Sequence, residues 1–150
     1  MNAIYLLKHD HREVERLFTE FLEAEDSGAE QREEIFQQIE KELLVHGDIE
    51  EQLLYPAVED FIPNEVEEAV REHQEIRNTL GDLLEIEIDD EGFERTLMML
   101  MERVQNHVQE EEGPGGILEV ARQRLPNSRL QSMAKLMLQI REEAEGELAA

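Results

Sequence analysis

The chain has 150 residues, no cysteine and a formal net charge of −24, and its length suits one domain with one apolar core. The absence of cysteine excludes disulfides and iron–sulfur ligation, and the acidic excess disfavours binding to nucleic acid or to an anionic membrane surface. No segment approaches the roughly 20 apolar residues of a membrane span, and the first residues lack a signal-peptide pattern, so we expect a single cytoplasmic domain over residues 1–150.

Apolar residues recur at steps of three and four along most of the chain, which is the pattern of amphipathic helices. The first helix is predicted over residues 2–25, and a second from about residue 35 to Tyr55-Pro56. A third begins after Pro63, with Asn64 as its N-cap, and continues to Leu84. Further helices are predicted over residues 93–111 and 117–125 and from residue 128 onward.

Four long helices joined by short connections favour an all-α fold, an up-down antiparallel four-helix bundle over about residues 2–112. The glycine-rich loop 113–116, a short helix and an amphipathic last helix complete the domain over residues 113–150, with the last helix packed outside the bundle. No alternation of apolar and polar residues competes with this interpretation.

Four histidines fall into two copies of one pattern, and each lies in phase with the apolar residues of its own helix. His73 follows His11 by 62 residues, and His107 follows His46 by 61. Because the apolar face of an amphipathic helix is buried, we expect one histidine from each of the four helices to point into the core.

A glutamate follows the second histidine of each copy by four residues, at Glu50 and Glu111. Residues four apart share a helix face, so each His-x-x-x-Glu pair directs one nitrogen and one carboxylate to the same region. The alternative is a set of hydrogen-bonded core histidines, but burying so many polar groups unpaired would cost several kcal/mol. Nitrogen and oxygen ligands without thiolate suit iron, with manganese or zinc as alternatives. We therefore predict a two-metal site with the ligands His11, His46, Glu50, His73, His107 and Glu111.

Other polar residues near these positions receive lesser roles. His9 is expected at the surface, and Tyr55 in the core or at its rim without chemistry. Gly47 is expected to serve close packing or, alternatively, to leave room for a diatomic ligand. Glu72 or Glu110 could accept a hydrogen bond from an imidazole N–H. Solvated faces are otherwise expected for five carboxylates: Asp10, Glu51, Glu72, Glu110 and Glu112.

The order of these motifs resembles the hemerythrin-like (HHE cation-binding) domain family over about residues 2–112. The resemblance is carried by Leu7-Lys8-His9-Asp10-His11, by His46-x-x-x-Glu50 before Leu54-Tyr55-Pro56, by Glu72-His73 and by His107-x-x-x-Glu111. It implies an up-down four-helix bundle with two iron ions in an oxo- or hydroxo-bridged, non-haem centre held by the six residues above. It also implies binding of, or reaction with, dioxygen, peroxide or nitric oxide, or a role in iron sensing.

Two departures from the oxygen-carrying members of this family bear on function. The oxygen carriers have two histidines four residues apart on the third helix. In this chain the residues four positions before and after His73 are Ala69 and Arg77. The carriers also use His-x-x-x-x-Asp on the fourth helix, where this chain has His107-x-x-x-Glu111. The resulting ligand set is nearly symmetric, which favours redox turnover over reversible carriage.

We therefore predict a non-haem di-iron protein that binds or reacts with a small diatomic molecule or peroxide, with peroxide consumption (a catalase-like activity) as its enzymatic form. The alternatives are an iron- or oxygen-sensing module without turnover and a purely structural helical bundle. A ferritin-like oxidase is disfavoured, because those bundles use Glu-x-x-His, the reverse order at a different spacing.

Overall fold

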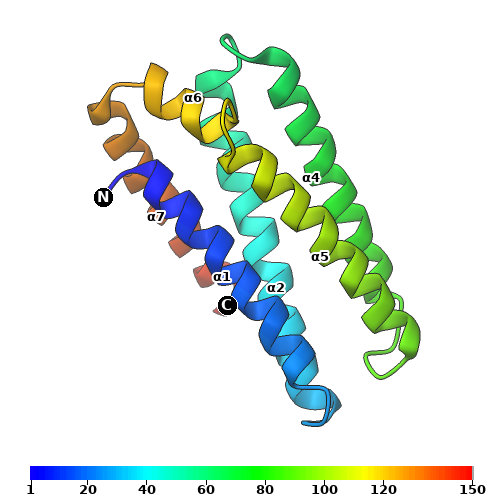
Figure 1. Cartoon of the computed structure of the whole chain (residues 1–150). Coiled ribbons are helices and arrows are strands. Elements are labelled where there is room, and N and C mark those ends of the chain that lie inside the picture. Colours follow the sequence, from blue (N-terminus) through cyan, green and yellow to red (C-terminus); the bar gives the residue numbers. More distant parts are fainter. Residues whose placement is uncertain (150) are drawn as a thin grey trace.

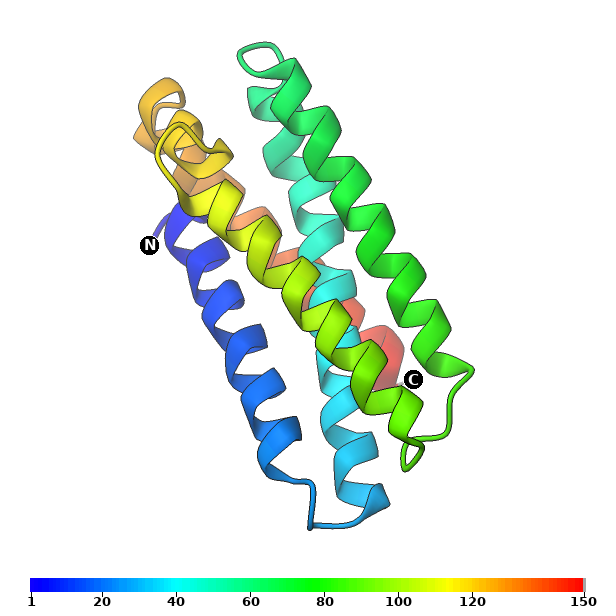
Figure 2. The same cartoon turned by 45° about the vertical axis from the view of Figure 1, so that its right-hand side comes forward.

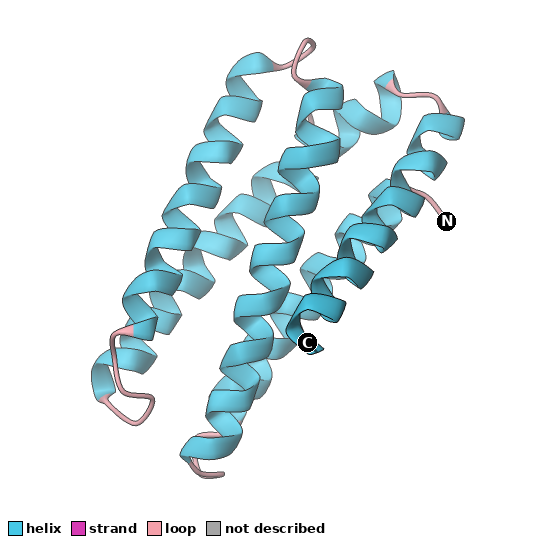
Figure 3. Cartoon of the chain, turned by 180° about the vertical axis from the view of Figure 1, so that it is seen from behind, coloured by secondary structure: helices cyan, strands magenta, loops and turns pink. Residues whose placement is uncertain are grey.

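The computed structural model describes residues 1–149, which are helical almost throughout and contain no strand (Figure 3). Five helices of 21 to 23 residues make up most of the molecule (Figure 1): α1 (Ala3–Glu23), α2 (Ala29–Ile49), α4 (Pro63–Leu84), α5 (Glu91–Glu112) and α7 (Asn127–Ala149). Three shorter segments connect them: the π-helical turn η1 (Glu50–Leu54), α3 (Tyr55–Val58) and α6 (Ile117–Arg124). The all-α prediction is confirmed for the described residues.

The long helices lie side by side as a helical bundle (Figures 1 and 2). α1 packs against α2 and α4 against α5, and the two pairs meet through contacts of α1 with α5 and of α2 with α4. α7 packs against α1, α2 and η1. A bilayer-spanning stretch is not found among the described helices.

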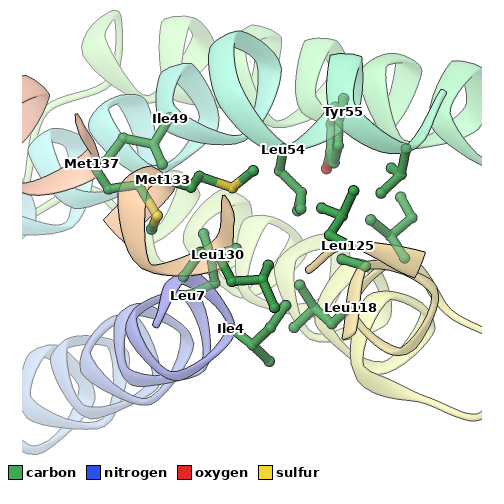
Figure 4. Close-up of a cluster of buried hydrophobic side chains, with 14 of the residues drawn as sticks. Ile4, Leu7, Ile49, Leu54, Tyr55, Leu118, Leu125, Leu130, Met133 and Met137 are labelled. Atoms are coloured by element: carbon green, nitrogen blue, oxygen red, sulfur yellow. The ribbon is translucent and has the colours of Figure 1, made fainter. Parts of the chain in front are cut away.

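Two apolar clusters fill the interior, one toward each end of the long helices. One contains Phe21, Phe93 and other side chains from the end of α1, the start of α2, the end of α4 and the start of α5. The other joins the opposite ends of α1, α2 and α4 to η1, α3, α6 and α7 through residues such as Leu7, Leu130 and Met133 (Figure 4). α7 is therefore part of the apolar core at one end of the molecule.

A layer of buried polar side chains lies between the two clusters. On α1, His11 lies between Leu7 of one cluster and Val14 of the other. His73 occupies the same position on α4. The apolar side chains therefore hold the helices together on both sides of the histidines and fix the distances across the polar layer.

The second predicted helix does not run unbroken to Tyr55-Pro56. α2 ends at Ile49, and a π-helical turn follows over Glu50–Leu54 before α3 begins. Pro56 supplies a reason, because proline lacks the amide hydrogen and crowds the carbonyl four residues before it in an α-helix. In a π turn, residues five apart lie on one face, and the Tyr55 N–H donates to the Glu50 carbonyl oxygen. The side chains of Glu50 and Tyr55 are consequently both buried.

Two other boundaries depend on proline and glycine. α4 begins at Pro63 itself, without a cap from Asn64, since proline is favoured in the first turn of a helix. At the end of α5, Gly115 has a φ of 74°, and a Cβ on Gly116 would lie 2.6 Å from the Glu111 carbonyl oxygen. Only glycine fits where the chain folds back so closely over the last turn of α5.

Candidate metal centre

The six side chains predicted as ligands meet in the polar layer between the two clusters. Their exposed fractions are 0 to 7%, so the predicted inward direction of the four histidines is confirmed. Two groups of four have ligand atoms within 4.8 Å of one another, and Glu50 and Glu111 belong to both groups. The first group is completed by His11 and His46, and the second by His73 and His107.

The histidines are paired through their Nε2 atoms. Nε2 of His11 lies 3.1 Å from Nε2 of His46, and Nε2 of His73 lies 3.1 Å from Nε2 of His107. Each pair joins neighbouring helices, α1 with α2 and α4 with α5.

The two carboxylates lie between these histidine pairs. Glu50 Oε1 is 3.1 Å from His46 Nε2 and 3.0 Å from His73 Nε2. Glu111 reaches both pairs as well. Its Oε1 is 3.4 Å from His11 Nε2, and its Oε2 is 3.1 Å from His107 Nε2. Each glutamate can therefore be shared between two sites.

The other ring nitrogen of every histidine, Nδ1, contacts a carboxylate from a neighbouring helical segment. The four pairs are His11–Glu112 at 2.5 Å, His46–Asp10 at 3.1 Å, His73–Glu51 at 2.8 Å and His107–Glu72 at 2.7 Å. The prediction of solvated faces is therefore wrong for Asp10, Glu51 and Glu112, and the prediction that Glu72 accepts an imidazole N–H is confirmed.

A sequence signal for these carboxylates exists. Each stands directly beside a predicted ligand: Asp10 beside His11, Glu51 beside Glu50, Glu72 beside His73 and Glu112 beside Glu111. Adjacent residues on a helix point about 100° apart, so a side chain next to an inward one faces a neighbouring helix. The adjacency of acid and ligand on each helix could therefore have identified them.

Arginines cover three of the four carboxylates from outside. The pairs are Arg12–Glu112 at 2.7 Å, Arg77–Glu51 at 2.8 Å and Arg141–Asp10 at 2.8 Å, the last from α7. Burial raises the pKa of Asp10, but the His46 and Arg141 partners outweigh it, so this pKa lies below its usual value. Glu72 forms no such pair with an arginine of the described chain, and its neighbour Glu110 has a raised pKa because the two acids hydrogen-bond.

The arrangement leaves unshared electron pairs facing one another in the centre. When Nδ1–H donates to a carboxylate, a neutral imidazole presents only a lone pair at Nε2. Two such pairs of nitrogens face each other at 3.1 Å, and Glu50 Oε2 and Glu111 Oε1 have no hydrogen-bond partner. Buried acceptors without donors are costly unless cations or protons compensate them. The donor set therefore fits bound metal ions.

Without a cation, protons supply this compensation. Burial lowers the pKa of His46, but the charge of Glu50 and the bond to Asp10 outweigh it and raise the pKa to about 10. Burial is likewise outweighed at His107, whose pKa Glu111 raises well above the usual value. Metal ions that bind here would therefore displace protons.

Tyr55 belongs to the centre, although the sequence assigned it no chemistry. It is 2% exposed, and its hydroxyl donates to Glu111 Oε2 at 2.9 Å. The Tyr55 hydroxyl oxygen also lies 3.3 Å from Glu50 Oε1 and 3.2 Å from His73 Nε2. Burial and the two carboxylates raise the pKa of Tyr55, so it remains a protonated phenol. Its inward direction follows from the π turn.

Two further sequence predictions concern His9 and Gly47. His9 is exposed, as predicted. A Cβ on Gly47 would lie 3.7 Å from His73 Nδ1, an ordinary contact, so close packing does not require glycine there. Gly47 instead lines a small apolar cavity beside the four histidines.

Comparison with known proteins assigns a class to this arrangement. The model of the family described as "Hemerythrin HHE cation binding domain" matches residues 2–114, and the chain belongs to this family. A protein named DNA nickase from Nostoc sp. (strain PCC 7120) is 32% identical over 113 residues, which are 75% of this chain and 32% of that protein. The chain thus spans about a third of the length of this curated relative.

A solved structure shares the fold. The crystal structure of a hemerythrin HHE cation binding domain-containing protein from Mycobacterium kansasii aligns with a TM-score of 0.81 at 23% sequence identity. The alignment covers 98% of this chain and 89% of that chain. The α7 region, which lies beyond the family match, is therefore included in the shared fold.

We expect Tyr55→Phe to destabilise the metal-free protein by about 1–3 kcal/mol, because it removes the hydroxyl that donates to the buried Glu111 carboxylate. Urea denaturation in the presence of a chelator measures this change in the free energy of unfolding. Tyr5→Phe is the matched control, since Tyr5 is 59% exposed and should tolerate the change. Equal stability of the two variants would contradict the role given to Tyr55.

The raised pKa of His46 sets a pH dependence for the metal-free protein. A pKa of about 10 in the folded state, against an ordinary 6.5, gives a stabilisation that is complete below pH 6.5 and is lost as the pH rises through about 10. We expect the free energy of unfolding with chelator present to fall over this window, and His46→Gln to weaken the fall. A stability that stays constant or increases over the window would contradict the assignment.

Proposed function

We propose that the six buried side chains bind two metal ions and that the metal is iron. Each pair of histidines would hold one ion, with Glu50 and Glu111 shared between the two. The observation that carries this proposal is the pair of buried carboxylate oxygens without a hydrogen-bond partner, Glu50 Oε2 and Glu111 Oε1. Imidazole and carboxylate ligands without thiolate suit iron, and also manganese or zinc.

We further propose that residues 1–150 form one domain in which α1, α2, α4 and α5 are an up-down antiparallel four-helix bundle. The packing of α1 with α2 and of α4 with α5 supports this, as do the connections seen at opposite ends of the helices (Figure 2). In such a bundle, side chains that point inward from facing helices can form one metal site. The absence of cysteine fits a reducing compartment, and we propose the cytoplasm.

We propose that the centre binds or reacts with a small oxidant such as dioxygen, peroxide or nitric oxide. An apolar cavity of about 30 Å³ lies against all four histidines, with walls that include Val14, Ile76 and Leu80. This is room for a molecule no larger than about two waters. Bound iron would supply the electron transfer to or from such a ligand. The apolar walls exclude larger molecules, and the carboxylates on Nδ1 fix the imidazole orientations.

A second candidate is an iron- or oxygen-sensing module without turnover. The observation that favours it is the Nostoc relative, in which the matched segment is only 32% of the protein. A domain carried within a larger protein can report its occupancy to the rest of the chain. We propose that the present domain itself does not bind nucleic acid, because its net charge of −24 opposes contact with phosphates.

Metal analysis tests the centre, and we expect two iron ions per chain in the protein as isolated. His46→Gln and Glu111→Gln should each lower the content to about one or less. The first variant removes a ligand from one ion, and the second weakens a ligand that both ions would share. His9→Gln is the matched control, since His9 is exposed and should leave the content unchanged. Full iron content in both ligand variants, with helicity intact by circular dichroism, would show that the ligand set is wrong.

Addition of hydrogen peroxide separates the two candidate functions. We expect the iron-loaded protein to evolve dioxygen steadily and His46→Gln to lose this activity, because that variant lacks a ligand. An oxygen electrode measures the rate. No evolution from iron-loaded wild type, together with a melting temperature that rises on iron binding, would favour the sensing module instead.

A further inference from the structure

The four carboxylates that hydrogen-bond to the histidine Nδ1 atoms differ in whether an arginine covers them from the solvent side. Three of them are covered from outside by Arg12, Arg77 and Arg141. The fourth, Glu72, forms no ion pair with a lysine or arginine of the described chain. Its neighbour is a second carboxylate, Glu110. One side of the centre is therefore not closed by an arginine.

A groove opens on this side, between the start of α4, the end of α5 and the loop 113–116, with a volume of about 620 Å³. We call it the acidic groove, because its lining includes no lysine or arginine and five glutamates: Glu65, Glu68, Glu72, Glu110 and Glu111. Glu68 pairs with Arg71, which is exposed on the outer face of α4. Glu65 and Glu110 form no ion pair with the side chains of residues 1–146, which the structure describes.

The acidic groove reaches the centre itself. His107 and Glu111, two of the proposed ligands, form part of its lining. Glu111 is 2% exposed, and its Oε1 has no hydrogen-bond partner. A cation in the groove would therefore stand beside two side chains of the proposed centre, His107 and Glu111.

A second groove gives a direct comparison. It lies between α1 and α5, has a volume of about 530 Å³ and touches the centre at His11. Its lining includes Arg12, which is bonded to Glu112, and also Glu15. The two grooves are similar in size and each reaches a proposed ligand, but only the second places an arginine in the path.

We propose that the acidic groove is the uptake route for divalent cations, with Glu65, Glu68 and Glu110 as a transient binding site and Glu72 beside His107 as the step into the centre. This inference rests on the proposed two-metal centre and adds the path by which it is filled. Carboxylate oxygens are preferred ligands of hydrated divalent cations. A cleft of one charge sign raises the association rate of an oppositely charged ion by about 10- to 10³-fold, and salt removes the effect.

The rate of Co²⁺ uptake by the metal-free protein tests this route, followed by stopped-flow absorption at low ionic strength. We expect Glu65→Gln/Glu110→Gln to load about 3- to 10-fold more slowly than wild type and to reach the same content at equilibrium. The control is Glu15→Gln/Glu102→Gln, which removes the same charge at Glu15 in the second groove and at the exposed Glu102. It should load at the wild-type rate. In about 1 M NaCl all three proteins should load at similar rates.

A wild-type rate in the groove variant, or equal slowing in the control variant, would overturn the uptake route and leave the two-metal centre in place. A lower final Co²⁺ content in the groove variant at an unchanged rate would also overturn it, because the substituted residues would then act in the centre. Wild-type protein that takes up no Co²⁺ would overturn the proposed function together with the route. Failures of the two proposals therefore give different results.

Discussion

A closed ring of histidine–carboxylate hydrogen bonds holds the middle of this molecule. Each bond joins one helix to the next around the bundle. The four pairs are Asp10 (α1) with His46 (α2), Glu51 (η1) with His73 (α4), Glu72 (α4) with His107 (α5) and Glu112 (α5) with His11 (α1). Each bond keeps the proton on Nδ1 and turns Nε2 inward. Rotation of any one helix would break two of these bonds, so the packing of the helices and the geometry of the centre depend on each other.

The ring is also the reason that a charged layer can lie between two apolar clusters. Six carboxylates and three arginines occupy the layer, so a negative surplus remains when the histidines are neutral. Buried charge of one sign is costly, and bound cations would offset it. Arg141 brings a positive charge from α7, which lies beyond the family match over residues 2–114. The C-terminal helix thus supports the centre electrostatically as well as through the apolar core.

Departures from regular structure fall where the centre needs them. The π turn at Glu50–Leu54 turns the Glu50 carboxylate toward both histidine pairs and the phenol of Tyr55 toward His73 and the two buried glutamates. At the end of α5, the tight glycine turn leaves Glu111 and Glu112 in the helix, facing inward and toward α1. The same turn borders the acidic groove, so one irregular segment both ends the helix and forms a wall of the groove.

The sequence by itself determined which side chains point inward. Helical periodicity is local, so the phase of His46 and Glu50 along one helix follows from a spacing of four, and the duplicated pattern extends this to the other helices. The sequence predicted that the second helix ends near Pro56, but it did not predict the π turn that directs Tyr55 inward. Only the tertiary structure decided the partners of the histidines, because a side chain beside an inward one meets whatever the neighbouring helix presents. The contact of Arg141 with Asp10, 131 residues apart, depends on how far apart and at what rotation the helices pack, and no local pattern in the chain encodes those quantities.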